Sequence, residues 1–165
     1  SGAMELDKGE TDLAAVVEAT VGQLSAHTAS RGSGFALKLE AETLPVALDR
    51  LEVERIVWRL LATLAGVSAP GEVLKLKLRS RGGLARVDLT LPAALASKDD
   101  DALFQAAAGT VPQVISAGVF GVGFALRLAR AEARAAGGLL VRKDAKLRLT
   151  LPDLTAIALA HTEGA

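Results

Sequence analysis

Four residues in two apolar runs have types and spacings suited to binding an anion. Gly121 and Gly123 precede a run with helical spacing, and free backbone amides at such a position can hold a phosphate group. A tight turn into a helix gives the same pattern, and no Gly-Lys-Ser or Gly-Lys-Thr follows, which excludes a Walker-type loop. Arg59, in a second helical run, could meet an anion or a partner's carboxylate, or could reach solvent from the helix edge. Thr63, in the same run, is more typical of a packed helical threonine than of a ligand.

The other candidates for chemistry are interpreted as surface residues. The run Asp99-Asp100-Asp101 could bind magnesium or a basic partner, but a charge run in a loop is usually solvated. His27 and His161 are far apart in a chain without cysteine, so they do not predict a zinc site. No Ser-His-Asp or paired-carboxylate arrangement can be argued from the sequence. We therefore predict no catalytic residue and no metal ligand.

Composition restricts the class of protein further. The 165 residues are half hydrophobic, which is enough for one domain with a core that needs no disulfide bonds. Lys and Arg number 19, as do Asp and Glu, and aromatic residues make up 3%, which argues against a nucleic-acid partner. No apolar run reaches the roughly 18 residues of a membrane span. The lack of cysteine fits a reducing, cytoplasmic compartment.

Hydrophobic periodicity predicts the elements that must position the candidate residues. Apolar residues at three- and four-residue spacings predict helices over 11–29, 50–65 and 121–136, the first two capped by Thr11 and Asp49. Extended or alternating runs predict strands at 35–40, 44–48, 73–79, 84–91, 139–141 and 147–151. Strands 73–79 and 84–91 should form an antiparallel hairpin with one wet, basic face.

This order of elements predicts an α/β two-layer sandwich, a mixed sheet of about five strands covered by three helices. The long connection 92–118 is interpreted as a functional loop or lid. Residues 1–4 resemble the remnant of a cleaved expression tag, so we expect further native sequence upstream. The expected domain is 5–152, followed by a tail at 153–165.

Several strings, in this order, resemble the ATP-binding domain of two-component sensor histidine kinases, in the superfamily that includes gyrase and MutL. The resemblance covers roughly 12–152. The strings are DLAAVV at 12–17, Asp49 with VERIVWRLLATL at 53–64, Leu103-Phe104, GVGFAL at 121–126, AGGLLV at 136–141 and LRLTLP at 147–152. His27 is not in the acceptor setting of that family, because Thr-Ala-Ser-Arg follows it.

The departures from the family pattern fall on its nucleotide-binding positions. Arg59 and Thr63 align with two asparagines that face the triphosphate, the second of which holds magnesium. Leu91 aligns with the aspartate that accepts a hydrogen bond from adenine, and Ala93 with a glycine beside the base. The second glycine box keeps only Gly121 and Gly123 of its glycines. Losing the adenine acceptor and the magnesium ligand should cost about 3–6 kcal/mol of ATP affinity.

The resemblance therefore implies a degenerate ATP-binding domain of a bacterial sensor histidine kinase, without ATP or another cofactor. Such a domain would act in phosphorelay signalling by contacting a response regulator, a partner histidine kinase or a phosphotransfer protein. It would touch neither nucleic acid nor membrane, and it would dimerise only through upstream helices. It would be cytoplasmic even where the full-length protein is membrane-anchored.

Two alternatives stay open at this stage. The first is an active ATP-dependent protein-histidine kinase domain, in which Thr63 holds magnesium and the turn at Gly121 and Gly123 holds phosphate. The second is the docking domain of a histidine phosphotransfer protein.

Overall fold

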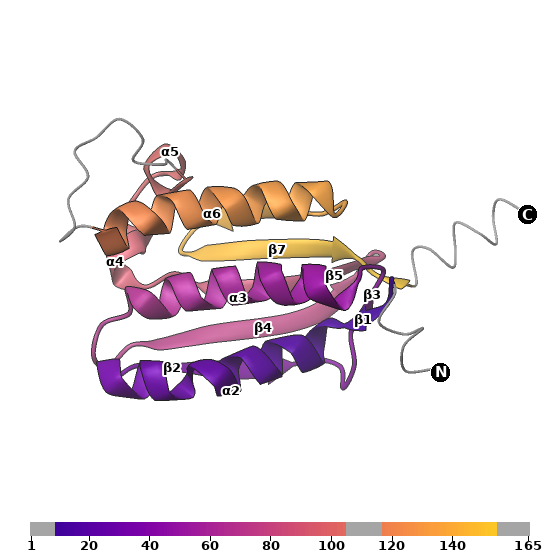
Figure 1. Ribbon diagram of the computed structural model, residues 1–165, viewed down its shortest axis with the longest axis horizontal. Helices are drawn as coiled ribbons and strands as arrows, with labels where there is room; N and C mark the ends of the chain where they lie inside the picture. The colour runs from indigo at the N-terminus through magenta and orange to yellow at the C-terminus, as the bar shows by residue number, and fades with distance from the viewer. Residues whose placement is uncertain (1–8, 105–116, 155–165) are drawn as a thin grey trace, which may run out of the picture.

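Three helices cover one face of a mixed β-sheet in the computed structural model, which describes residues 9–104 and 117–154 (Figure 1). The covering helices are α2 (Leu13–Arg31), α3 (Arg50–Gly66) and α6 (Ala117–Ala135), and two short helices, α4 (Ala93–Ala96) and α5 (Asp100–Phe104), lie between β5 and α6 in the sequence. The strands are β1 (Thr11–Asp12), β2 (Gly34–Leu39), β3 (Pro45–Val46), β4 (Val73–Arg81), β5 (Leu84–Thr90), β6 (Leu139–Lys143) and β7 (Lys146–Pro152). The predicted two-layer sandwich is confirmed.

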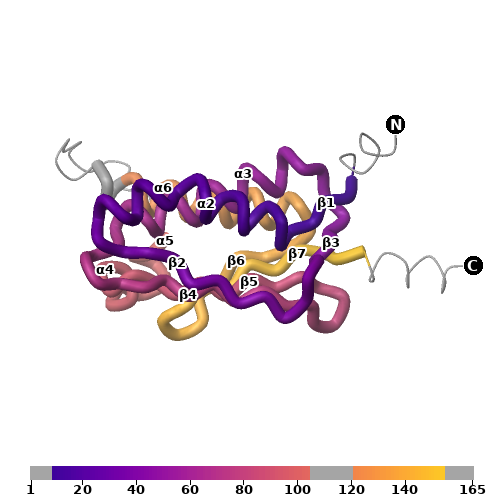
Figure 2. Tube along the Cα trace, turned by 90° about the horizontal axis from the view of Figure 1, so that it is seen from below, coloured from indigo at the N-terminus to yellow at the C-terminus, as the bar shows by residue number. Residues whose placement is uncertain are grey.

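The main sheet has five strands in the order β2-β4-β5-β7-β6. Strands β2 and β4 run parallel, and the other neighbouring pairs run antiparallel. Seen edge-on, α2, α3 and α6 lie on the same side of the sheet (Figure 2). The predicted hairpins β4–β5 and β6–β7 both form. Strands β4, β6 and β7 extend beyond their predicted bounds, and β5 ends one residue earlier than predicted.

The core lies between the sheet and the helices. Because side chains alternate along a strand, Leu74, Leu76 and Leu78 of β4 all point to the helix layer and are almost fully buried. Helix α3 buries one apolar stripe against them, formed by Val53, Ile56, Val57, Leu60, Leu61, Leu64 and Ala65. Burial of this apolar surface is the main stabilising contribution to the fold.

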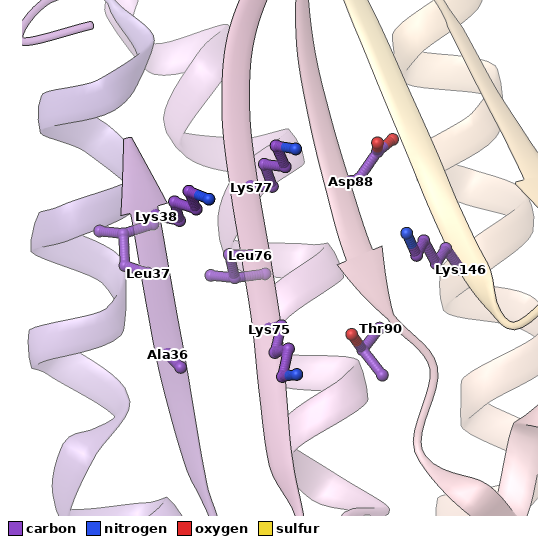
Figure 3. A pocket seen from close by; sticks show the side chains of 9 residues that line it. All are labelled: Ala36, Leu37, Lys38, Lys75, Leu76, Lys77, Asp88, Thr90 and Lys146. Atoms are coloured by element: carbon purple, nitrogen blue, oxygen red, sulfur yellow. The ribbon is translucent and has the colours of Figure 1, made fainter. Parts of the chain in front are cut away.

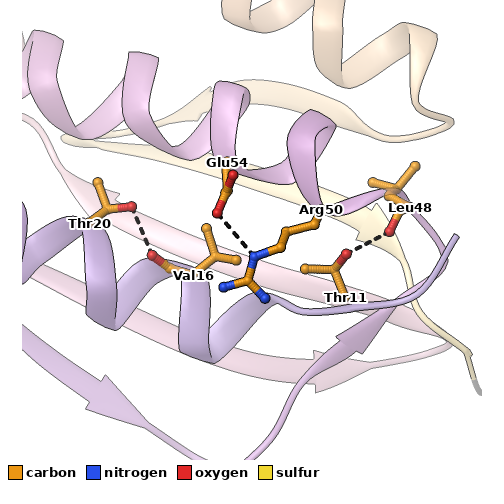
Figure 4. Close-up of polar contacts among 6 residues, drawn as sticks. All are labelled: Thr11, Val16, Thr20, Leu48, Arg50 and Glu54. Atoms are coloured by element: carbon orange, nitrogen blue, oxygen red, sulfur yellow. Dashed lines mark hydrogen bonds and ion pairs between the residues drawn. The ribbon is translucent and has the colours of Figure 1, made fainter. Parts of the chain in front are cut away.

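The predicted helix caps need correction. The carboxylate of Asp12, not the hydroxyl of Thr11, caps α2 by accepting a hydrogen bond from the amide of Ala14. The Thr11 hydroxyl instead donates to the carbonyl of Leu48 at 2.8 Å (Figure 4). Asp49 precedes α3 but makes no side-chain capping bond. Thr11 lies one residue before the cap position, and its hydroxyl is already bonded to the Leu48 carbonyl.

The segment 44–48 was predicted as a strand, and it forms a strand outside the main sheet. Only Pro45–Val46 is extended, and this β3 pairs with β1 in a separate two-stranded sheet. The Leu44 amide donates to the Asp12 carboxylate at 2.8 Å, which ties the segment to the start of α2. Asp153, expected in the tail, is buried, pairs with Val46 and accepts a hydrogen bond from Ser80. The packed structure thus continues into the predicted tail.

The third helix begins earlier than predicted. Helix α6 starts at Ala117, so Gly121 and Gly123 lie inside it rather than at its opening turn. Its C-terminal end follows the predicted glycine signal, because Gly137 has φ +87° and the Gly138 amide donates to the Ala133 carbonyl. None of the helices in residues 9–104 and 117–154 has the length and apolar character to cross a membrane.

Candidate functional site

Arg59 of α3 is held by an ion pair with Glu132 of α6. The guanidinium Nε lies 2.8 Å from Oε1 of the carboxylate and Nη2 lies 3.3 Å from Oε2, so the contact is bidentate. The two side chains are 30% and 22% exposed, which makes this a half-buried pair rather than a surface contact. Arg59 therefore neither points freely into solvent nor faces an external anion, because it pairs with a carboxylate of its own chain. Thr63, one helical turn further along, is half-buried.

The end of β5 is apolar where the resemblance implied an adenine-binding aspartate. The Leu91 side chain is 3% exposed and belongs to the hydrophobic core, and its amide donates to the carbonyl of Ala145. The Ala93 amide, at the first residue of α4, donates to the Glu72 carboxylate at 2.7 Å. The other oxygen of Glu72 accepts from the Ala69 amide at 2.6 Å. The Ala93 amide, which lies beside the expected nucleotide position, is thus already hydrogen-bonded to the Glu72 carboxylate.

Gly121 and Gly123 do not form a phosphate-binding turn. Because α6 begins at Ala117, their amides belong to the interior of the helix, where each amide donates to the carbonyl four residues earlier. Neither glycine has a positive φ.

The helical position of Gly121 leads to a stability prediction. A Cβ placed on Gly121 meets no atom within 4 Å, so Gly121→Ala should raise the free energy of unfolding by about 0.5–1 kcal/mol. Thermal unfolding followed by circular dichroism should show a rise of about 1–4 °C. A fall in the melting temperature would indicate that Gly121 needs a conformation other than helical.

Two apolar residues of the predicted lid are buried against helix α6. Leu103 and Phe104 of α5 are 1% and 4% exposed, and α5 contacts α6. The Arg130 guanidinium of α6 lies 4.2 Å from the centre of the Phe104 ring, within the range of a cation–π contact. The sequence predicts that four more apolar residues of this region, Val111, Val114, Ile115 and Phe120, pack over the empty pocket. The first three lie outside the described residues, and the side chain of Phe120 is not described.

The remaining candidates occupy surface or capping positions. His27 is exposed on α2, as predicted, and His161 lies outside the described residues. The Asp99 carboxylate accepts a hydrogen bond from the Ala102 amide at 2.8 Å, so it stabilises the start of α5. The Asp100 Oδ1 lies 3.9 Å from the Arg142 Nη1, so the two side chains form an ion pair. Within the described residues, no group of three or more His, Cys, Asp and Glu side chains could hold a metal ion.

Sequence reasoning missed the two acidic residues that define this site. Glu72 is 21 residues from Ala93, and Glu132 is 73 residues from Arg59. No local signal marks either glutamate, because pairs at such separations depend on how the helices and strands pack. The C-terminal end of α3, α4 and the N-terminal end of α6 lie at the same end of the molecule (Figure 1). Glu72 contacts the Ala93 amide at this end, whereas Glu132 pairs with Arg59 near the C-terminal end of α6.

Comparisons with known proteins place the fold. No protein-family model and no curated protein matches the sequence. Among solved structures, the mycobacterial sensor histidine kinase MprB is similar over 87% of this chain and 96% of its own, with 16% identity and a TM-score of 0.62. The catalytic domain of histidine kinase ThkA is similar over 87% and 94%, with 14% identity and a TM-score of 0.64. A histidine kinase from Burkholderia phymatum STM815 is similar over 92% and 73%, with 20% identity and a TM-score of 0.63. The chain therefore has the fold of the catalytic domains of histidine kinases.

Proposed function

We propose that this chain is a degenerate ATP-binding domain of a two-component sensor histidine kinase, which does not bind ATP and acts by contacting another signalling protein. Leu91 carries the proposal. An aliphatic side chain that is 3% exposed can neither accept a hydrogen bond from an adenine amino group nor leave room for the base beside it. The partner would be a response regulator, a second histidine kinase or a phosphotransfer protein.

The ion pair of Arg59 supports the same proposal. For a triphosphate to use this guanidinium, it would have to displace the Glu132 carboxylate, which already makes two hydrogen bonds. A displaced Glu132 would then repel the phosphates from a half-buried position. Hydrogen bonds to charged groups contribute about 1.5–3 kcal/mol each, so the losses at adenine and metal lower ATP affinity by roughly two to four decades.

Nucleotide titration tests the proposal. The melting temperature of the purified chain should change by less than about 1 °C in millimolar ATP with magnesium, because a ligand stabilises only the state that it binds. A fluorescent ATP analogue should show no saturable binding below millimolar concentration. A nucleotide-binding catalytic domain of the same fold, measured in parallel, is the control. A rise of several degrees, or submillimolar binding, would overturn the proposal and favour the active-kinase alternative.

A further inference from the structure

The face of the sheet opposite the helices is strongly basic, although the chain has no net charge. Residues that pair across strands point to the same side, so the register identifies the side chains of this open face. Among the described residues its cations are Lys38, Lys75, Lys77, Arg79, Arg81, Arg86, Lys143, Lys146 and Arg148, and its acidic side chains are Glu40 and Asp88. The open face thus carries nine of the 19 Lys and Arg residues and two of the 19 Asp and Glu residues.

Cations on this face are placed directly opposite one another, where a sheet normally pairs opposite charges. Like charges in register oppose pairing of the strands, and an external anion relieves that repulsion. The like-charged pairs in register are Lys38 with Lys77, Arg79 with Arg86, and Lys143 with Lys146. The Lys77 Nζ lies 3.4 Å from Glu40 Oε1 and Lys77 pairs in register with Asp88, so the face attracts external negative charge mainly through its other cations.

A carboxylate of the chain, that of Asp88, already binds one arginine of this face. Asp88 is 7% exposed, and its carboxylate accepts two hydrogen bonds from Arg148, at 2.9 and 3.4 Å, which raise the pKa of Arg148. Burial, followed by repulsion from Arg148 and Arg79, lowers the pKa of Arg86. The Nε of Arg79 is buried and has no acceptor within the described residues. The Arg148 guanidinium is thus bound by a carboxylate, whereas the Nε donor of Arg79 has no acceptor within the described residues.

A shallow depression on this face is shaped for an apolar side chain within a ring of cations. It has a volume of about 260 Å³, and its lining includes Lys38, Lys75, Lys77 and Lys146, with Asp88 on one side. Figure 3 shows these lysine side chains coming from β2, β4 and β7 around the depression. The lining is mostly apolar, because the lysine stems and backbone carbons form much of it.

The chemistry of the face favours a protein partner over other polyanions. None of its described side chains is aromatic, and single-stranded nucleic acids need aromatic rings on which their bases stack. A planar bilayer fits a twisted five-stranded sheet poorly. Its exposed apolar side chains are Val73, Leu84 and Leu139. Val73 lies at the opposite end of the β4–β5 hairpin from Leu84, so the three do not form one patch that could insert into lipid.

We propose that the open face binds an acidic segment of a partner protein, with carboxylates on the lysines and arginines and one apolar side chain in the depression. This inference deepens the proposed function by naming the chemistry of the partner. It does not depend on whether ATP binds, since the open face and the candidate nucleotide site lie on opposite sides of the sheet.

The test uses the full chain and a fluorescein-labelled peptide of repeated Glu-Glu-Leu-Glu units. Fluorescence anisotropy should show saturable binding that weakens with added salt, because salt screens exposed charges. A peptide with glutamine in place of glutamate should bind at least about tenfold more weakly. In ¹⁵N–¹H NMR spectra, the shifted amide signals should belong to β2, β4 and β7.

Charge reversal locates the binding. Lys75 and Lys146 are exposed and line the depression, so Lys75→Glu with Lys146→Glu should weaken binding about tenfold or more and leave the fold intact. The matched control reverses Arg55 and Arg127, which are exposed on the helix layer, and should change affinity less than about twofold.

Three outcomes would overturn the proposal. The first is equal binding of the glutamate and glutamine peptides, and the second is equal loss in the control variant. The third is binding to vesicles of phosphatidylcholine with phosphatidylglycerol, or to single-stranded RNA, that depends on Lys75 and Lys146 while the peptide does not bind. Because none of these measurements contains nucleotide, their failure is distinguishable from failure of the proposed function.

Discussion

Leu91→Asp is expected to destabilise the protein by about 4 kcal/mol or more, and not to create ATP binding. Leu91 is 3% exposed, so the introduced carboxyl would replace an apolar side chain of the core and lose its hydration. If the substitution supplied the adenine acceptor of an open pocket, it would be tolerated and would increase nucleotide affinity. Urea denaturation and titration with ATP and magnesium distinguish these results.

The pH dependence of this variant gives a second readout. Burial raises the pKa of a carboxyl, so the folded variant would bind its proton more tightly than the unfolded chain. The variant should therefore regain stability relative to the original protein as the pH falls from 7 toward the range in which carboxyls titrate. Leu91→Met is the control, because it nearly conserves volume and should cost less than about 1.5 kcal/mol. A Leu91→Asp variant as stable as Leu91→Met at neutral pH would show that position 91 is open to water.

Gly138→Ala is expected to cost about 3 kcal/mol or more, because the backbone of β7 leaves no room for a side chain. A Cβ at Gly138 would overlap the carbonyl oxygen of Thr150 and lie 2.9 Å from its carbonyl carbon. The same glycine amide caps α6 through the Ala133 carbonyl, so the backbone cannot move away without losing the cap. Thermal unfolding should show a fall of roughly 6–12 °C.

Gly121→Ala is the matched control for this substitution, since it adds the same methyl group where no atom lies within 4 Å. The two variants should shift the melting temperature in opposite directions. A change below about 1 °C for Gly138→Ala would mean that β6 and β7 separate readily at this point.

Much of the fold could be predicted because its signals are local. The apolar spacing in 50–65 and the alternation in 73–79 set one helix and one strand without reference to the rest of the chain. The start of α6 was placed four residues too late, because Gly121 and Gly123 were interpreted as its opening turn. Glycine weakens a helix by only about 1 kcal/mol, so the packing of α6 on α3 overrides that local preference.

The sequence predicted some of the residues that occupy the candidate site, but not their contacts or their burial. Arg59 and Leu91 were identified from the sequence, but the contact of Arg59 with Glu132 and the burial of Leu91 were not. Contacts between residues far apart in sequence depend on the register and packing of whole elements, which no local pattern encodes.

The sequence by itself determined the order of helices and strands, the layered architecture and the lack of net charge, because periodicity and composition belong to the chain before it folds. The tertiary structure alone decided which charges lie together. Strand pairing brings the cations of β2, β4, β5, β6 and β7 onto one open face, and helix packing brings Glu132 to Arg59. The physical reason is that a charge interacts according to its distance in space, and that distance is set only when the sheet and helices assemble.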